Sequence, residues 1–335
     1  MAEKEDKKNG SHRLIVQPDD GTAPVIALID EAKKSLRVKQ FTLTDPDVMA
    51  ALVKAHKRGV DVRIMLNPHR SSGDRANDES YAALRKAGLK VEWTNPAFAV
   101  THEKSMVVDD AVALIATFNM ATKYFTETRD YGIITTHHRP IAEVISCFEA
   151  DWARKPFEPE AGSNLLWSSN NSRRVMAEFI DGAERELDIQ HPKFVDVTIV
   201  ERIALALKRD VKVRVLCGGK HGISDYDVLD TFASLRLMDA FGAKVRRQKH
   251  LKLHAKLLIA DGKSAQIGSM NIDRSAFDLR RELGGVLHDE HIIKGLSKVF
   301  EHDWEQAKPY EAPDPLKPET HNEGELPHDP HFIHE

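Results

Sequence analysis

The sequence predicts an α/β protein made of two similar halves, and two observations lead to this prediction. Segments with apolar residues at helical spacing alternate with strand-like segments along the chain. The order of these segments recurs one half-chain later: Val62 and Val213 are 151 positions apart, and Trp152 and Trp304 are 152 apart. Alternating strands and helices favour layers packed on a mixed sheet. We expect the halves to pack about a pseudo-two-fold axis, with one motif from each half at the interface.

The elements of the two halves correspond in order. Three helix-then-strand units appear in each half, at 23–45 and 173–196, at 46–66 and 197–217, and at 81–93 and 234–247. The segment 155–164 contains two prolines and a glycine and is predicted to connect the halves. The last residues are rich in proline, glutamate and histidine, which is typical of a disordered tail. The predicted boundaries are 12–155 for the first half, 165–308 for the second and 309–335 for the tail.

Composition and charge exclude several classes of protein. A formal net charge of −4 over 335 residues provides no overall basic field for nucleic acid. The first residues are charged and lack the apolar core of a secretion signal, and no apolar run reaches the ~18 residues of a spanning helix. We therefore expect a soluble protein, cytoplasmic or peripheral to a membrane. Cys147 and Cys217 lie in apolar segments and are expected to be buried free thiols rather than a disulfide or metal site.

A histidine and a lysine two residues apart occur four times, but two of these pairs share a longer pattern. Only His102 and His254 are followed by an aspartate at plus 7, an asparagine at plus 17 and an acid at plus 28. Chance explains an isolated pair, whereas matched spacing in both halves indicates a functional motif. The motif residues are Lys104, Asp109, Asn119 and Asp130 in the first half, and Lys256, Asp261, Asn271 and Glu282 in the second.

Strand geometry gives this spacing a chemical meaning. Residues i and i+2 of a strand point to the same face, so each histidine projects beside its lysine. A tight turn after the motif then returns the chain and brings the asparagine back beside the histidine. Two imidazoles, two cations and two amides would line one pocket. The cations and amides suit a tetrahedral phosphoryl group, and the imidazoles suit a nucleophile and an acid.

The paired H-x-K-x4-D motif with G-S-x-N resembles the phospholipase D superfamily. The second half, "LHAKLLIADGKSAQIGSMNIDRSAFDLRRELGG", most resembles its cardiolipin-synthase-like bacterial branch. The resemblance covers nearly the whole chain and implies two tandem α/β/α sandwich halves that share one active site. It also implies hydrolysis or transfer of a phosphodiester through a phosphohistidine, without a metal or other cofactor.

The resemblance also implies roles for individual residues. It makes His102 the nucleophile and His254 the acid, whereas cations around His254 would lower its pKa and favour the reverse assignment. Lys104 and Lys256 supply the positive charge that stabilises the transferring phosphoryl group. The phosphate-binding residues are expected to be Asn119, Asn271, Ser269 of G-S-x-N, and Thr117 at the serine position of "ATFN", where Ala116 replaces the glycine.

Four carboxylates remain to be interpreted. Asp130 and Glu282 are, by spacing, the candidates that orient the two imidazoles. Asp109 and Asp261 lie beside turns, and a fold-stabilising role suits them at least as well as catalysis.

The substrate class depends on residues around the motifs. The loop 94–100 is apolar, with an exposed-looking Phe98, and fits acyl chains. A basic segment would attract nucleic acid or anionic lipid equally, but it lacks interleaved aromatic residues: Lys244, Arg246, Arg247, Lys249, Lys252 and Lys256. We therefore favour a monomer that acts on phospholipid headgroups at a membrane surface. The alternatives are a metal-independent nuclease, a cardiolipin-synthase-like phosphatidyl transferase and, least favoured, a non-catalytic phosphate-binding protein.

Overall fold

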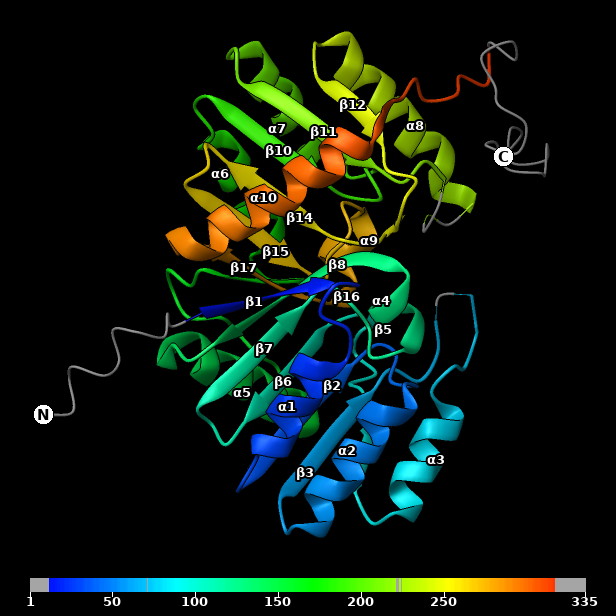
Figure 1. Cartoon of the computed structure of the whole chain (residues 1–335), viewed down its shortest axis with the longest axis vertical. Helices are drawn as coiled ribbons and strands as arrows, with labels where there is room; N and C mark the ends of the chain where they lie inside the picture. The colour runs from blue at the N-terminus through cyan, green and yellow to red at the C-terminus, as the bar shows by residue number, and fades with distance from the viewer. Residues whose placement is uncertain (1–11, 71, 221–222, 224, 317–335) are drawn as a thin grey trace, which may run out of the picture.

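The computed structural model describes residues 12–70, 72–220, 223 and 225–316. It contains two α/β halves that follow one another along the long axis of the molecule (Figure 1). Each half has a mixed sheet with helices on both faces, so the predicted architecture of two similar α/β halves is confirmed.

The elements of the first half are β1 (His12–Gln17), α1 (Ala23–Glu31), β2 (Ser35–Gln40), α2 (Pro46–Lys57), β3 (Asp61–Leu66), α3 (Asp78–Lys86), β4 (Lys90–Trp93), β5 (Val100–Thr101), β6 (Lys104–Val108), β7 (Val112–Ala116), α4 (Thr122–Thr126), β8 (Thr128–Thr135) and α5 (His138–Trp152). Those of the second half are β9 (Leu165–Trp167), α6 (Ser172–Asp181), β10 (Glu186–Gln190), α7 (Val197–Lys208), β11 (Lys212–Cys217), α8 (Asp225–Ala240), β12 (Lys244–Arg247), β13 (Lys252–Leu253), β14 (Leu257–Ala260), β15 (Ser264–Gly268), α9 (Arg274–Asp278), β16 (Arg280–Arg281), β17 (Leu283–Leu287), α10 (Glu290–Gln306) and β18 (Lys308–Pro309).

The two sheets have matching strand orders. The first runs β1-β8-β7-β6-β2-β3-β4, and the second runs β18-β12-β11-β10-β14-β15-β17-β9. In each, three strands linked by helices are parallel, β2-β3-β4 and β10-β11-β12, and a hairpin that carries the histidine–lysine motif joins antiparallel to the first of them. The motifs therefore lie where the parallel strands end, which is where open α/β sheets bind ligands.

Local sequence signals explain where the helices begin. Asp45 accepts hydrogen bonds from the backbone N–H groups of Asp47 and Val48 at the start of α2, and Pro46 occupies the first helical position. Asp196 caps α7 in the same way. These capped helices then bury an apolar stripe against the sheet.

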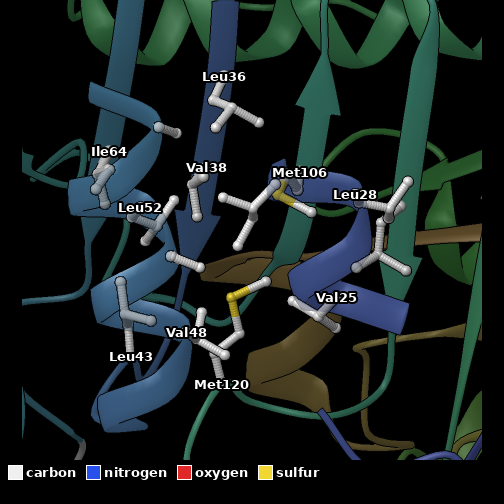
Figure 2. Close-up of a cluster of buried hydrophobic side chains, with 14 of the residues drawn as sticks. Val25, Leu28, Leu36, Val38, Leu43, Val48, Leu52, Ile64, Met106 and Met120 are labelled. Carbon is white, nitrogen blue, oxygen red and sulfur yellow. The ribbon is translucent and has the colours of Figure 1, made fainter. Parts of the chain in front are cut away.

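The largest core of the first half lies between its sheet and the helices α1 and α2 (Figure 2). Val38 of β2, Leu52 of α2 and Met106 of β6 are fully buried there. Burying a side chain of this size stabilises a fold by about 1.5–3 kcal/mol. Because β6 belongs to the motif hairpin, packing in this core holds the hairpin in place.

Asp109 and Asp261 stabilise the fold far from the histidines. The Asp109 carboxylate accepts hydrogen bonds of 2.7–2.9 Å from the backbone N–H groups of three consecutive residues, 33–35. Asp261 accepts equivalent bonds of 2.7–3.0 Å from residues 184–186. Partial burial acts to raise the pKa of each carboxyl, but these donors outweigh it and lower the pKa. Both aspartates also adopt a positive φ at the hairpin turn, so their role is to tie the turn to the start of the neighbouring strand.

The tail prediction is wrong for its first residues. β18 pairs with β12, the Tyr310 ring packs on Phe232, and Ala312 is 3% exposed. An unpaired sheet edge and an apolar surface are available there, so the chain continues along them. The remaining predicted tail, 317–335, lies outside the described residues.

Two smaller expectations can also be compared with the structure. Cys147 and Cys217 are buried free thiols, as expected. Across the described residues, the helices are all too short or too polar to cross a membrane.

Candidate active site at the seam between the halves

At the boundary between the two halves, which we call the seam, short strands of the second half pair with strands of the first. β16 of the second half pairs in parallel with β5 of the first, and β13 pairs in parallel with β8; Figure 1 shows β16 beside β5 where the halves meet. His102 follows β5, and His254 follows β13. The carbonyl of Arg281 accepts hydrogen bonds from the backbone N–H groups of His102 and Glu103, at 2.9 and 3.0 Å. The carbonyl of Arg129 does the same for residues 254 and 255, at 3.2 and 2.9 Å.

Each histidine is oriented by a carboxylate of the opposite half. Nδ1 of His102 lies 3.0 and 3.1 Å from the Glu282 carboxylate oxygens and 3.1 Å from the carbonyl oxygen of Ser269. Nδ1 of His254 lies 2.8 Å from the Asp130 carboxylate. These partners only accept hydrogen bonds, so Nδ1 carries the proton in both rings and Nε2 holds the lone pair. The structure therefore brings the two histidines and the two acids together, and each histidine pairs with the acid of the other half.

The hydroxyls of Thr117 and Ser269 hold these carboxylates, a role that was not predicted from the sequence, and their phosphate-binding role stays a prediction. Thr117 donates to Asp130 at 2.5 Å, and Ser269 donates to Glu282 at 2.6 Å. A hydroxyl has one proton, and here that proton is already given to a carboxylate. Both residues are fully buried. They therefore position the acids behind the histidines.

The lysines are buried beside their own histidines. Lys104 and Lys256 are each 1% exposed, and each donates to the backbone carbonyl of the histidine two residues before it. Lys256 Nζ also lies 3.1 Å from Nε2 of His254. Among the described residues, Nε2 of His102 has no such partner. The lone pair of His102 is therefore the more available one.

Burial dominates the pKa values in the site. Burial, followed by the positive charge of Lys104, holds the pKa of His102 well below its ordinary value. Burial lowers the pKa of His254 to about 4, although the Asp130 carboxylate acts in the opposite direction. It lowers the pKa of Lys256 to about 8 and that of Lys104 well below its usual range. The charges of both lysines also lower the pKa of His102.

The two motif asparagines have side-chain groups available for a ligand. Both amide atoms of Asn119 are buried without a hydrogen-bond partner among the described residues, and so is Oδ1 of Asn271. A buried amide without a partner is unusual because leaving it unpaired costs about 1–3 kcal/mol. Phosphate binding by these amides remains a prediction that their free state favours.

The predicted apolar and basic borders of the site differ from the structure in part. Phe98 is half-buried, and its ring lies 4.1 Å below the guanidinium carbon of Arg281. Arg246 donates to the carbonyl of Trp304 at 2.8 Å, and Lys252 forms an ion pair with Glu127 at 2.5 Å. Phe98 and several of the basic residues are therefore engaged within the protein, and they carry less weight as evidence about the substrate.

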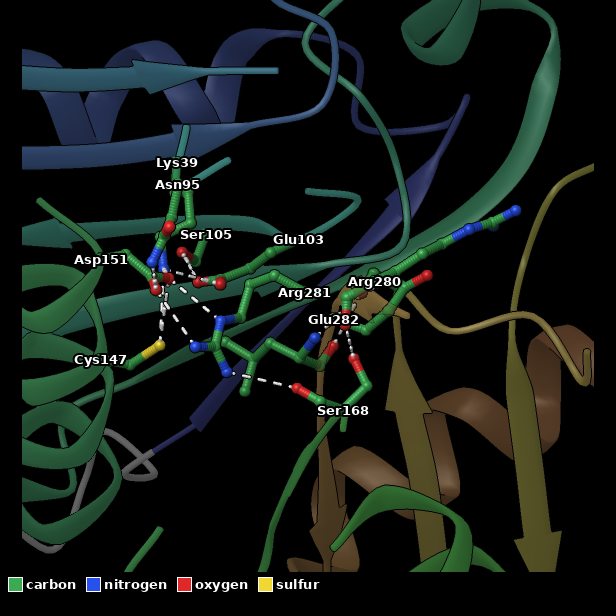
Figure 3. Close-up of polar contacts among 12 residues, drawn as sticks. Lys39, Asn95, Glu103, Ser105, Cys147, Asp151, Ser168, Arg280, Arg281 and Glu282 are labelled. Carbon is green, nitrogen blue, oxygen red and sulfur yellow. Dashed lines mark hydrogen bonds and ion pairs between the residues drawn. The ribbon is translucent and has the colours of Figure 1, made fainter. Parts of the chain in front are cut away.

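Lysine and arginine side chains bind the acidic residues of a group that could otherwise hold a metal ion. Among the described residues, Glu103, Cys147 and Asp151 lie close enough together to hold an ion. Lys39 Nζ lies 2.9 Å from Glu103 and 2.8 Å from Asp151, and Arg281 binds the same aspartate (Figure 3). Two cations thus balance two carboxylates in this group.

Sequence reasoning missed two arginines and two aspartates at the seam. Arg129 and Arg281 each stand 27 residues after a motif histidine, and Asp151 and Asp303 each stand 49 residues after one. The sequence did contain a signal for them. Each arginine directly precedes a motif acid, and each aspartate directly precedes a tryptophan that repeats in both halves. Their partners, however, lie in the opposite half, which spacing within one half does not reveal.

Fold and site together define a class of protein in which two α/β halves build one paired histidine–lysine site. The family "Cardiolipin synthase, PLD-like domain" matches residues 25–152 and 176–304. The chain therefore belongs to the phospholipase D superfamily, in its cardiolipin-synthase-like branch.

Similar proteins agree with this membership. The chain is 24% identical over 319 residues to a cardiolipin synthase of Oceanobacillus iheyensis, covering 83% of this chain and 65% of that protein. It is 22% identical to cardiolipin synthase 1 of Bacillus anthracis, covering 88% and 66%. The chain thus spans slightly less than two thirds of the length of these relatives. The structure of a phosphatidylserine synthase from Haemophilus influenzae superposes with a TM-score of 0.72 at 15% identity, covering 90% of this chain and 88% of that one, which shows the shared fold.

Proposed function

We propose that the protein transfers the phosphatidyl group of a phospholipid to an alcohol or to water through a covalent phosphohistidine. The observation that carries this proposal is the crosswise pairing at the seam. Glu282 binds Nδ1 of His102 and Asp130 binds Nδ1 of His254, so Nε2 of each ring is left for the substrate, and Lys104 and Lys256 are buried in the same site. Two oriented imidazoles with adjacent cations suit a double displacement at phosphorus.

In the first step, the lone pair on Nε2 of His102 attacks phosphorus. A P–N bond forms, the P–O bond to the departing alcohol breaks, and His254 donates a proton to the leaving oxygen. The negative charge of the bound phosphodiester favours the protonated form of His254 that this step needs. In the second step, neutral His254 takes the proton of the incoming alcohol or water, whose oxygen displaces His102. Lys104 and Lys256 stabilise the phosphoryl oxygens throughout.

The phospholipid substrate is supported by the relatives, which are named cardiolipin synthases. The surface near the seam is compatible with a bilayer. Leu279 is 57% exposed, its carbonyl accepts from Ala99 in the apolar loop, and the Arg274 side chain is 90% exposed nearby on α9. Apolar and cationic groups together favour an anionic membrane surface. We therefore propose peripheral contact with a membrane by a monomer, since one chain contains both histidines.

The proposal is tested by incubating the purified protein in excess EDTA with phosphatidylglycerol, phosphatidylcholine or single-stranded DNA. We expect a phosphatidyl product from lipid even in EDTA, because positive charge in the site comes from Lys104 and Lys256. We expect no cleavage of DNA. Mass spectrometry of the lipids separates transfer from hydrolysis. Cleavage of DNA alone would favour a nuclease, and turnover that requires a divalent ion would contradict the proposed chemistry.

The pH dependence of turnover should be bell-shaped, with an acid limb well below neutrality and an alkaline limb near pH 8. The neutral His102 needed for attack is present above its pKa, which burial and the charge of Lys104 hold well below the ordinary value, so activity should fall only as the pH drops well below neutrality. The cationic form of Lys256 is present below its pKa, so activity falls as the pH rises through about 8. A pH series from 3 to 10 measures both limbs. Lys256→Arg should move the alkaline limb upward because guanidinium stays charged; an unmoved limb would exclude Lys256 as its source.

A further inference from the structure

Two buried arginine–aspartate pairs cross the seam in opposite directions. Arg281 of the second half binds Asp151 on α5 through Nε and Nη2, both at 3.1 Å (Figure 3). Arg129 of the first half binds Asp303 on α10 in the same two-pronged way, at 2.8 and 3.0 Å. We call Arg281–Asp151 and Arg129–Asp303 the two seam pairs. All four residues are at most 3% exposed.

Each arginine also directly precedes a carboxylate that orients a histidine. Arg281 precedes Glu282, and its own carbonyl accepts from the backbone N–H groups of His102 and Glu103. Arg129 precedes Asp130 and holds the backbone of residues 254 and 255 in the same manner. Two consecutive residues of one half therefore fix the other half's histidine through its backbone and its ring. The guanidinium anchors this two-residue segment to the half that carries the histidine.

We propose that Arg129 and Arg281 are positioning residues that set the geometry of the histidine in the opposite half by anchoring the neighbouring carboxylate. A two-pronged arginine–carboxylate bond restricts both distance and angle. Without it, the segment is held across the seam mainly by backbone bonds, and the carboxylate shifts relative to the imidazole. A misplacement of about 1 Å can cost ~10²-fold in rate.

The pair at Arg281 has a further connection to its histidine strand. Glu103, between His102 and Lys104, binds Lys39, and Lys39 also binds Asp151. Removing both charges of this seam pair leaves Lys39 and Glu103 paired with one another. The double variant Arg281→Gln with Asp151→Asn is therefore charge-balanced, which avoids the large cost of an unpaired buried charge.

A matched control lies on the same helix. Arg63 binds Glu149 of α5 at 2.6 and 2.8 Å, two residues before Asp151. This pair lies within one half and touches neither histidine segment. Arg63→Gln with Glu149→Gln leaves Arg37 paired with Asp110, so it removes a two-pronged bond at a more exposed position of the same helix without crossing the seam.

The test uses full-length protein labelled with [15N]histidine, and it rests on the proposed function only for its kinetic part. The imidazole nitrogen signals of His102, assigned by their loss in His102→Ala, should show protonated Nδ1 in the wild type and a mixture of tautomers in Arg281→Gln/Asp151→Asn. Turnover should fall about 10²-fold, mainly in kcat, and the control should match the wild type in both measurements.

A folded seam variant with the wild-type tautomer would overturn the inference, as would an equal change in the control. If the wild type turns over no phospholipid, the proposed function fails while the tautomer measurement still decides the inference. Should the double variant not fold, Arg281→Lys replaces it, because lysine keeps the charge and loses only the two-pronged geometry. A tautomer mixture in Arg281→Lys supports the inference, and an unchanged tautomer refutes it.

Discussion

Replacing His102 or His254 by alanine is expected to reduce turnover by at least about 10⁴-fold while leaving the protein folded. Each imidazole performs a different part of the same transfer, and residues that act as a unit lose nearly all activity when one is removed. The fold should persist because the carboxylates behind the rings keep other donors: Ser269 for Glu282 and Thr117 for Asp130. Initial rates with phospholipid measure the loss, and circular dichroism checks the fold.

Trapping the intermediate assigns the two roles. Quenching turnover in alkali preserves a phosphohistidine, and mass spectrometry then locates it. We expect the label on His102, because Nε2 of His254 is already contacted by Lys256 while that of His102 is free among the described residues. A label on the peptide 251–257 would reverse the assignment. A folded alanine variant with near wild-type turnover would refute the phosphohistidine route altogether.

Separating the halves is expected to remove activity completely. The fragments 1–160 and 161–335 each contain one histidine, and the carboxylate that orients it lies in the other fragment. Apolar clusters also cross the seam: Tyr131 and Ile133 pack with Leu253 and Ile267. Buried apolar area of this kind drives reassociation, so co-expressed fragments should recover part of the turnover that separate ones lack.

Mutant fragments provide the control for this result. A His102→Ala first fragment combined with an unmodified second fragment should remain inactive, because the site needs both histidines. Full activity in either isolated fragment would contradict a site shared between the halves. Gel filtration of the intact chain measures the expected monomer.

Local patterns in the sequence determined the duplicated α/β fold and the motif residues. Strand periodicity predicts that His102 and Lys104 share a face, and likewise His254 and Lys256, although both histidines lie between two strands in the structure. Asp109 lies beside a turn that its own neighbours define. Each of these features depends on residues close together in the chain, so their spacing is sufficient to predict them.

Only the tertiary structure decided how the halves complete one another. Asp130 stands 28 residues after His102 but binds His254, and Thr117 donates a hydrogen bond to that acid. The spacing of a repeat is identical whether an acid faces its own half or the other, so the sequence contains no signal for the crosswise choice. The choice is made where β13 and β16 cross the seam and pair with β8 and β5. It depends on packing between segments more than 120 residues apart. The roles of the seam arginines likewise depend on contacts between distant segments, so only the structure revealed them.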